Sequence, residues 1–64
     1  MNYTKTTLDN TDYFETTNAR GNITTVWEMC GTLFVQTNRS PARAFQDIAK
    51  PSKDAVALIA VMEA

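Results

Sequence analysis

Two glycine-containing segments limit what this chain of 64 residues folds into. Asn18-Ala19-Arg20-Gly21-Asn22 and Glu28-Met29-Cys30-Gly31-Thr32 each place a glycine after two ordinary residues, between runs rich in threonine, valine, isoleucine and aromatic residues. This pattern is typical of a three-residue hairpin loop, in which a type I turn is followed by a left-handed residue and glycine has no steric cost. Two such loops in series predict a three-stranded antiparallel meander.

β-branched and aromatic residues concentrate in three runs that we expect to be its strands, at residues 13–17, 23–29 and 32–37. The loops also fix the pairing. Phe14 is expected opposite Val26 in the first hairpin, and Val26 opposite Phe34 in the second. The first register sets Asp12 opposite Glu28, a like-charge pair at which either the pairing stops or the register is wrong. An alternative interpretation makes 23–37 one long strand that bends at Gly31.

Side chains alternate between the faces of a strand, so these registers predict two surfaces. One surface carries Tyr13, Ile23, Trp27, Leu33 and Val35. The other carries Phe14, Val26 and Phe34. We expect a helix to cover the first surface with Phe45 and Ile48.

The segments that flank the meander are less regular. Residues 1–11 are polar and are expected to form a ragged first strand or a loose arm. Ser40 is a good N-cap and Pro41 suits a first helical position, so a helix is predicted from there to Lys50, where Pro51 ends it.

The segment from Asp54 to Ala64 is ambiguous. Its alanines and a cap at Ser52 favour a helix. Its apolar run from Ala55 to Met62 has no polar side, which a small domain can hardly surround as a helix, and a buried strand is slightly favoured. The chain is therefore predicted to be a single α+β domain over residues 1–64, of order βββαβ, with βββαα as the alternative.

Composition excludes several classes of function. The single cysteine, Cys30, precludes an internal disulfide, and the absence of histidine argues against a zinc site. Cys30 has no histidine to activate it, and no phosphate loop or cofactor motif is present, so we expect neither an enzyme nor a cofactor. No leader peptide or membrane span is apparent, and a cytoplasmic location is expected.

Charge is nearly balanced, with a formal net charge of −1, which argues against a nucleic-acid binder. Basic residues gather in 39–53, which holds four lysines and arginines and one acidic residue. A solvated helix face is the simpler interpretation of that stretch, and an anion site is the rival.

One helix cannot cover both faces of a sheet. Phe14, Val26 and Phe34 are therefore expected to be exposed, covered by the N-terminal arm, or covered by a second molecule, either another copy or a foreign partner. Apolar patches of this kind mark protein interaction sites. The candidate protein-binding residues are Phe14, Val26 and Phe34, with Arg39 and Arg43 as charged contributors.

A resemblance bears on the class of function. The run Leu33-Phe34-Val35-Gln36-Thr37-Asn38-Arg39-Ser40-Pro41-Ala42-Arg43-Ala44, with the helix and strand expected after it, resembles the strand, Ser-Pro-x-x-Ala helix and strand of many small phage-encoded proteins. Those include inhibitors of host RNA polymerase and some anti-CRISPR proteins. The resemblance covers roughly the last half of the chain and is one of architecture, so it implies no site residue. It implies a compact protein that binds a host protein complex and blocks it.

The sequence thus predicts a non-enzymatic protein-binding inhibitor or regulator that covers a functional surface of a host protein or complex. A structural homo-oligomer, such as a homodimer, is the first alternative. A sheet that binds single-stranded nucleic acid is the second, although only Arg20 is basic between Tyr13 and Phe34.

Overall fold

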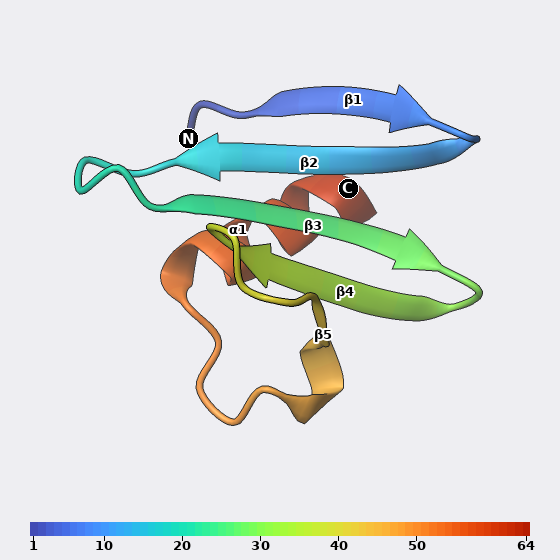
Figure 1. Cartoon of the computed structure of the whole chain (residues 1–64). Coiled ribbons are helices and arrows are strands. Elements are labelled where there is room, and N and C mark those ends of the chain that lie inside the picture. The colour runs from blue at the N-terminus through green and yellow to red at the C-terminus, as the bar shows by residue number, and fades with distance from the viewer.

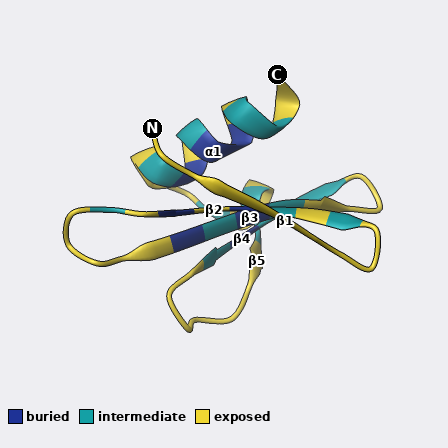
Figure 2. Ribbon diagram, turned by 90° about the horizontal axis from the view of Figure 1, so that it is seen from above, coloured by how far each residue is buried: buried dark blue, intermediate teal, exposed yellow.

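A five-stranded antiparallel sheet with one α-helix on one face forms the architecture of the chain (Figures 1 and 2). The structure is a computed structural model that describes all residues, 1–64. The strands follow one another in sequence order: β1 Thr4–Leu8, β2 Thr11–Thr17, β3 Ile23–Met29, β4 Thr32–Thr37 and β5 Arg43–Ala44. A short 3-10 helix, η1 (Phe45–Asp47), and the helix α1 (Lys53–Glu63) complete the chain. The domain is α+β, but the predicted three-stranded meander of order βββαβ is wrong.

The loop between β2 and β3 has the predicted three-residue form. Gly21 has φ of 82°, and its N–H donates to the carbonyl of Asn18. The side-chain oxygen of Asn18 accepts from the backbone N–H groups of Arg20 and Asn22, which closes the turn from inside. The predicted pairing of Phe14 with Val26 is confirmed.

The loop between β3 and β4 is shorter than predicted, and this changes the sheet. Cys30 and Gly31 both have positive φ, 53° and 81°, as a two-residue type I′ turn requires. The register is consequently shifted by one residue, so that Val26 lies opposite Val35 and Trp27 lies opposite Phe34. Because side chains alternate along a strand, this shift moves Phe34 to the other face of the sheet.

The N-terminal segment is an edge strand rather than a loose arm. β1 pairs with β2 over its whole length, from Thr4 opposite Glu15 to Leu8 opposite Thr11. The connection is a second two-residue turn, in which Asp9 and Asn10 both have positive φ. Asparagine and aspartate tolerate this conformation better than other non-glycine residues, which is the signal for the hairpin.

The hydrogen-bonded pairing of β2 with β3 ends at Phe14 and Val26. It does not reach the end of the sheet where the β1–β2 and β3–β4 turns lie. Beyond that pair the hairpins β1–β2 and β3–β4 diverge (Figure 1). Continued pairing would set Asp12 opposite Glu28, the like-charge pair that predicts either an end of pairing or a different register. The register is the predicted one, and pairing ends before this pair is reached. Asp12 instead accepts a hydrogen bond from the Thr7 hydroxyl and forms the only ion pair of the domain, with Lys5 at 3.6 Å.

The helix predicted from Pro41 to Lys50 is wrong. This segment instead contains β5, η1 and extended connections. The chain must travel from the edge of the sheet at β4 to the start of α1 on one face. An extended backbone advances about 3.3 Å per residue and a helix about 1.5 Å, so extended segments cover that distance with few residues.

The C-terminal segment is the helix α1, so the slightly favoured strand is wrong and the predicted alternative cap at Ser52 is confirmed. The Ser52 side chain accepts from the N–H of Ala55 at 3.1 Å. The helix buries Ala55, Leu58 and Ile59. The outward positions include Val56, which is 50% exposed, but the others are largely alanine, and little apolar surface is left in solvent.

The core lies between α1 and one face of the sheet. Phe14, Val26 and Val35 from the strands meet the buried helix residues, and Phe45 and Ile48 pack against the margin of the cluster. Val26 and Leu58 are fully buried. The buried Thr16 hydroxyl donates to the carbonyl of Asn2, which ties the N-terminus to the sheet.

We expect Ser52→Ala to lower the free energy of unfolding by about 1 kcal/mol, because the Ala55 N–H loses its acceptor at the start of α1. Urea denaturation followed by circular dichroism measures this, and Ser52→Asp, which keeps an acceptor, is the control. Equal stability of the Ser52→Ala variant and the wild type would contradict the cap.

Cys30→Asn is expected to raise the free energy of unfolding by about 0.5–1 kcal/mol, because Asn-Gly is the favoured pair for a type I′ turn. Thermal and urea denaturation under reducing conditions measure it. Cys30→Val, which is strained at positive φ, should lower stability. The opposite ranking of the two variants would refute the two-residue turn.

The pH dependence of stability should report on Asp12. The hydrogen bond from Thr7 and then the positive charge of Lys5 hold the pKa of Asp12 below its ordinary value. A carboxylate with a lowered folded-state pKa stabilises the fold above its unfolded-state pKa, and this contribution is lost as the pH falls through the folded-state pKa. Asp12→Asn should therefore be less stable than wild type at pH 7, and the difference should vanish in strong acid. A difference that is constant with pH in urea denaturation would contradict this.

Candidate functional site

The face of the sheet opposite α1 carries no helix, and we call it the open face (Figure 2). The strand registers assign side chains to it unambiguously, since Glu15 lies opposite Thr25 and Trp27 lies opposite Phe34. From β1 to β4 the open face comprises Thr4, Thr6, Leu8, Thr11, Tyr13, Glu15, Thr17, Ile23, Thr25, Trp27, Met29, Thr32, Phe34 and Gln36.

Three aromatic rings form a row across the middle of the open face. The ring centroids of Tyr13 and Trp27 are 5.2 Å apart, and those of Trp27 and Phe34 are 5.8 Å apart with planes only 19° from parallel. All three residues are half-buried although no other element covers them. They shield one another, and such ring pairs stabilise by about 0.5–1.5 kcal/mol beyond the area they bury.

The row bridges the point where the sheet divides. Tyr13 and Trp27 lie just beyond the last ladder pair of β2 and β3, where backbone pairing has stopped. Their ring contact therefore links the two diverging hairpins on the open face. On the other face Phe14 and Val26 hold the same strands together under α1.

Polar groups without positive charge surround the row. A shallow hollow of about 330 Å³ lies beside it, lined by Thr6, Leu8, Tyr13, Glu15, Thr25 and Gln36. No lysine or arginine is among the open-face side chains. The open face thus presents an apolar centre, hydroxyl and amide groups around it, and the carboxylate of Glu15.

Two of the three predicted apolar binding residues lie in the core. Phe14 is 8% exposed and Val26 is 0% exposed, both beneath α1, so the exposure that their predicted role requires is wrong. Phe34 is on the open face, separated from the other two by the sheet itself. The cause is the register of β4, which the shorter turn at Cys30 and Gly31 shifts by one residue.

The two predicted arginines are exposed but do not share one surface. Arg39 belongs to the connection from β4 to β5, residues 38–42, which lies on the side of the sheet opposite α1 (Figures 1 and 2). Arg43 lies in β5 opposite Val35, and its guanidinium donates to the carbonyl of Asp47. Arg39 is thus the cation whose segment borders the open face.

The sequence pattern predicts Tyr13 and Trp27 in the core beneath Phe45 and Ile48, but both lie on the open face. Phe45 and Ile48 pack against the core on the α1 side. A signal for the correct assignment exists in the sequence. A two-residue interpretation of Cys30-Gly31 places Trp27 opposite Phe34, and the three aromatic residues then fall on one face.

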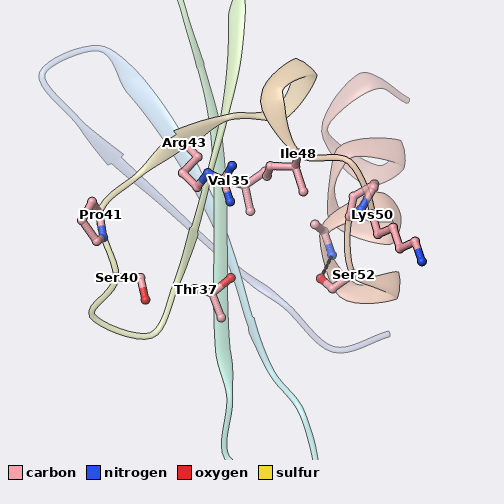
Figure 3. Close-up of a pocket in the computed structure, with 10 residues that line it drawn as sticks. Val35, Thr37, Ser40, Pro41, Arg43, Ile48, Lys50 and Ser52 are labelled. Atoms are coloured by element: carbon pink, nitrogen blue, oxygen red, sulfur yellow. Dashed lines mark hydrogen bonds between the residues drawn. The ribbon is translucent and has the colours of Figure 1, made fainter.

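A cavity of about 280 Å³ at the β4 edge is the rival site (Figure 3). It lies between the 38–42 connection and the start of α1, and its polar lining includes Thr37, Ser40, Arg43 and Ser52. The Ser52 hydroxyl already caps α1 and Arg43 already donates to Asp47. The Lys50 side chain extends away from Thr37 and Arg43 (Figure 3). Two of its polar side chains are thus already engaged, and the open face, with its contiguous aromatic row, is the stronger candidate.

No group of three or more histidine, cysteine, aspartate or glutamate side chains comes together that could hold a metal ion. Cys30 is an exposed free thiol in the β3–β4 turn.

Comparison with known proteins adds no family: no protein-family model, curated protein or solved structure matches this chain. The helix α1, at 11 residues, is too short to cross a bilayer, and no helix of the structure is long and apolar enough to do so. The strand, helix and strand on which the resemblance to small phage-encoded proteins rests differs from the observed order, in which β4 is followed by β5, η1 and α1.

Proposed function

We propose that this protein is a non-enzymatic protein-binding module, an inhibitor or regulator that attaches to a partner protein through its open face. The row of Tyr13, Trp27 and Phe34 is the observation that carries the proposal. This class of function is the one predicted from sequence, but the proposed contact surface is different. The contact residues are Tyr13, Trp27 and Phe34, and Arg39 lies at the border of the surface.

The composition of the open face supports a protein partner. The centres of protein interfaces are enriched in tyrosine, tryptophan, phenylalanine and methionine and depleted of charge, with a polar rim. The open face has its aromatic row at the centre, and around it lie threonine, glutamate and glutamine side chains together with Leu8, Ile23 and Met29. The partner surface that fits is a flat apolar patch with hydrogen-bonding groups at its margin.

The same features disfavour a sheet that binds single-stranded nucleic acid. Such sheets present free aromatic faces for base stacking and cations for the phosphates. Here Trp27 and Phe34 stack on each other, and no open-face side chain is cationic.

The mode of action that we propose is to cover a functional surface of a host protein complex, as small phage-encoded inhibitors do. We propose that the protein acts in the reducing cytoplasm, where an exposed thiol such as Cys30 persists.

Differential capture from a bacterial lysate tests the proposal. The immobilised wild type is compared with Trp27→Thr and Phe34→Thr, which remove the rings and keep good strand formers. Val56→Thr is the matched control, because Val56 is an exposed apolar residue on the outer side of α1. We expect a protein that wild type and Val56→Thr retain and that the two open-face variants lose.

Titration of that protein should then show at least thirtyfold weaker binding for each open-face variant, equivalent to about 2 kcal/mol for a strong anchor. Circular dichroism verifies that the variants fold. Equal retention of the same proteins by all four folded chains would refute the open face as the interface. Retention lost only with Val56→Thr would move the interface to α1.

A further inference from the structure

We infer that two copies of this chain pair through their β1 strands, edge to edge and antiparallel, to give one continuous ten-stranded sheet. This inference concerns the edge of the sheet and leaves the open face uncovered, so it stands or falls independently of the proposed function.

β1 is an unprotected edge. All five of its residues are exposed, and it pairs continuously with β2 without a bulge. Natural sheets protect free edges with very short strands, proline, bulges or projecting charges, because the unpaired N–H and C=O groups of an edge strand recruit another strand. The opposite edge is protected in this way, since β5 has only two residues and Pro41 stands just before it.

The one charge on β1 is directed away from the free edge. The Lys5 ammonium group lies 3.6 Å from the Asp12 carboxylate on β2, and 5.8 Å from the centroid of the Phe14 ring. The remaining side chains of β1 are threonines and a leucine. The edge therefore presents a neutral, strand-forming sequence to an incoming chain.

The backbone geometry selects the register. The two residues that flank a two-residue hairpin turn exchange backbone hydrogen bonds with each other. The backbone N–H and C=O groups of Leu8, Thr6 and Thr4 therefore point toward β2. Lys5 and Thr7 therefore direct their backbone groups outward. A two-fold axis at Thr6 sets Lys5 opposite Thr7 of the second copy, and all five residues of β1 overlap.

Other symmetric registers are worse. An axis at Lys5 sets the two lysines directly opposite each other, which is destabilising. An axis at Thr7 leaves only residues 6–8 paired, because Asp9 has left the strand with φ of 51°. The register centred on Thr6 instead sets Thr6 opposite Thr6, a favourable cross-strand pair, and places no like charges directly opposite each other.

The rest of the fold is compatible with this pairing. α1 packs over β2 and β3, so β1 has no helix above it that would collide with a second copy. An axis perpendicular to the sheet keeps both helices on one side and both open faces on the other. The aromatic rows of the two copies then continue each other, with the Thr6 pair between them.

Cross-linking tests the register directly. Thr6→Cys is made in a background where Cys30→Asn removes the other thiol, and Thr4→Cys in the same background is the matched control. Opposite residues of a non-hydrogen-bonded pair have Cα atoms about 4.5 Å apart, within reach of a disulfide. The two copies of residue 4 would lie about 13 Å apart, beyond that reach. We expect disulfide-linked dimer from Thr6→Cys and little from Thr4→Cys on mild oxidation.

Sedimentation of the reduced chain tests the association without a cross-link. Wild type should dimerise with increasing concentration, and Thr6→Lys, which sets two lysines opposite each other, should weaken the dimer at least tenfold. Thr4→Lys should have a much smaller effect, because residue 4 faces Leu8 of the second copy. Wild type that stays monomeric up to about 1 mM, or equal cross-linking at residues 4 and 6, would overturn the inference.

A third variant separates edge pairing from association through the open face. A dimer that Trp27→Thr disrupts and Thr6→Lys leaves intact would also overturn the inference and place the second copy on the open face. A dimer that only Thr6→Lys disrupts supports edge pairing, whatever the capture experiment shows for a foreign partner.

Discussion

The two-residue turn at Cys30 and Gly31 is the constraint on which the rest of the structure depends. Because both residues adopt positive φ, β4 pairs with β3 in the register that sets Val35 opposite Val26. That register builds the floor of the core from Phe14, Val26 and Val35, and α1 then packs on it. It also places Phe34 beside Trp27 on the other face. A loop longer by one residue would exchange the faces of β4, so that Phe34 would replace Val35 beneath α1 and the aromatic row on the other face would lose a ring.

The core and the open face are therefore two consequences of one register. A sheet with a single helix can hide only one of its faces, and this chain hides the face with the aliphatic residues and Phe14. The aromatic row on the other face is partly protected by the stacking of its own rings. These ring contacts reduce the apolar area that is exposed to water when no partner is bound. The same rings supply the large, rigid contact area that protein interfaces favour.

The division of the sheet beyond Phe14 and Val26 belongs to the β2–β3 register, which the loop at Gly21 sets independently of the turn at Cys30 and Gly31. Continuing the ladder would bring the carboxylates of Asp12 and Glu28 together, and the strands separate instead. Asp12 turns to Lys5 and Thr7 on β1, which strengthens the β1–β2 hairpin and draws the lysine away from the free edge. The separation of the two hairpins thus keeps the carboxylates apart, while Tyr13 and Trp27 bridge the gap on the open face.

Local signals in the sequence determined the parts of this protein that depend on a few neighbouring residues. Gly21 after Asn18 specified the first hairpin and its register, and Ser52 before an alanine-rich run specified the start of α1, although the apolar character of that run favoured a strand. Only the tertiary structure decided the faces of the sheet, because a difference of one residue in the turn at Gly31 reverses every side chain of β4, and local preference separates the two turns by little. It also decided the extended path from Pro41 to Lys50, where the distance from β4 to α1 outweighs a helix-start signal. Of the candidate site, an uncovered apolar sheet face was predictable from sequence, and Phe34 was a candidate residue but was predicted on the face of Phe14 and Val26. The places of Tyr13 and Trp27 were not predictable, because which apolar face a lone helix covers is settled by packing.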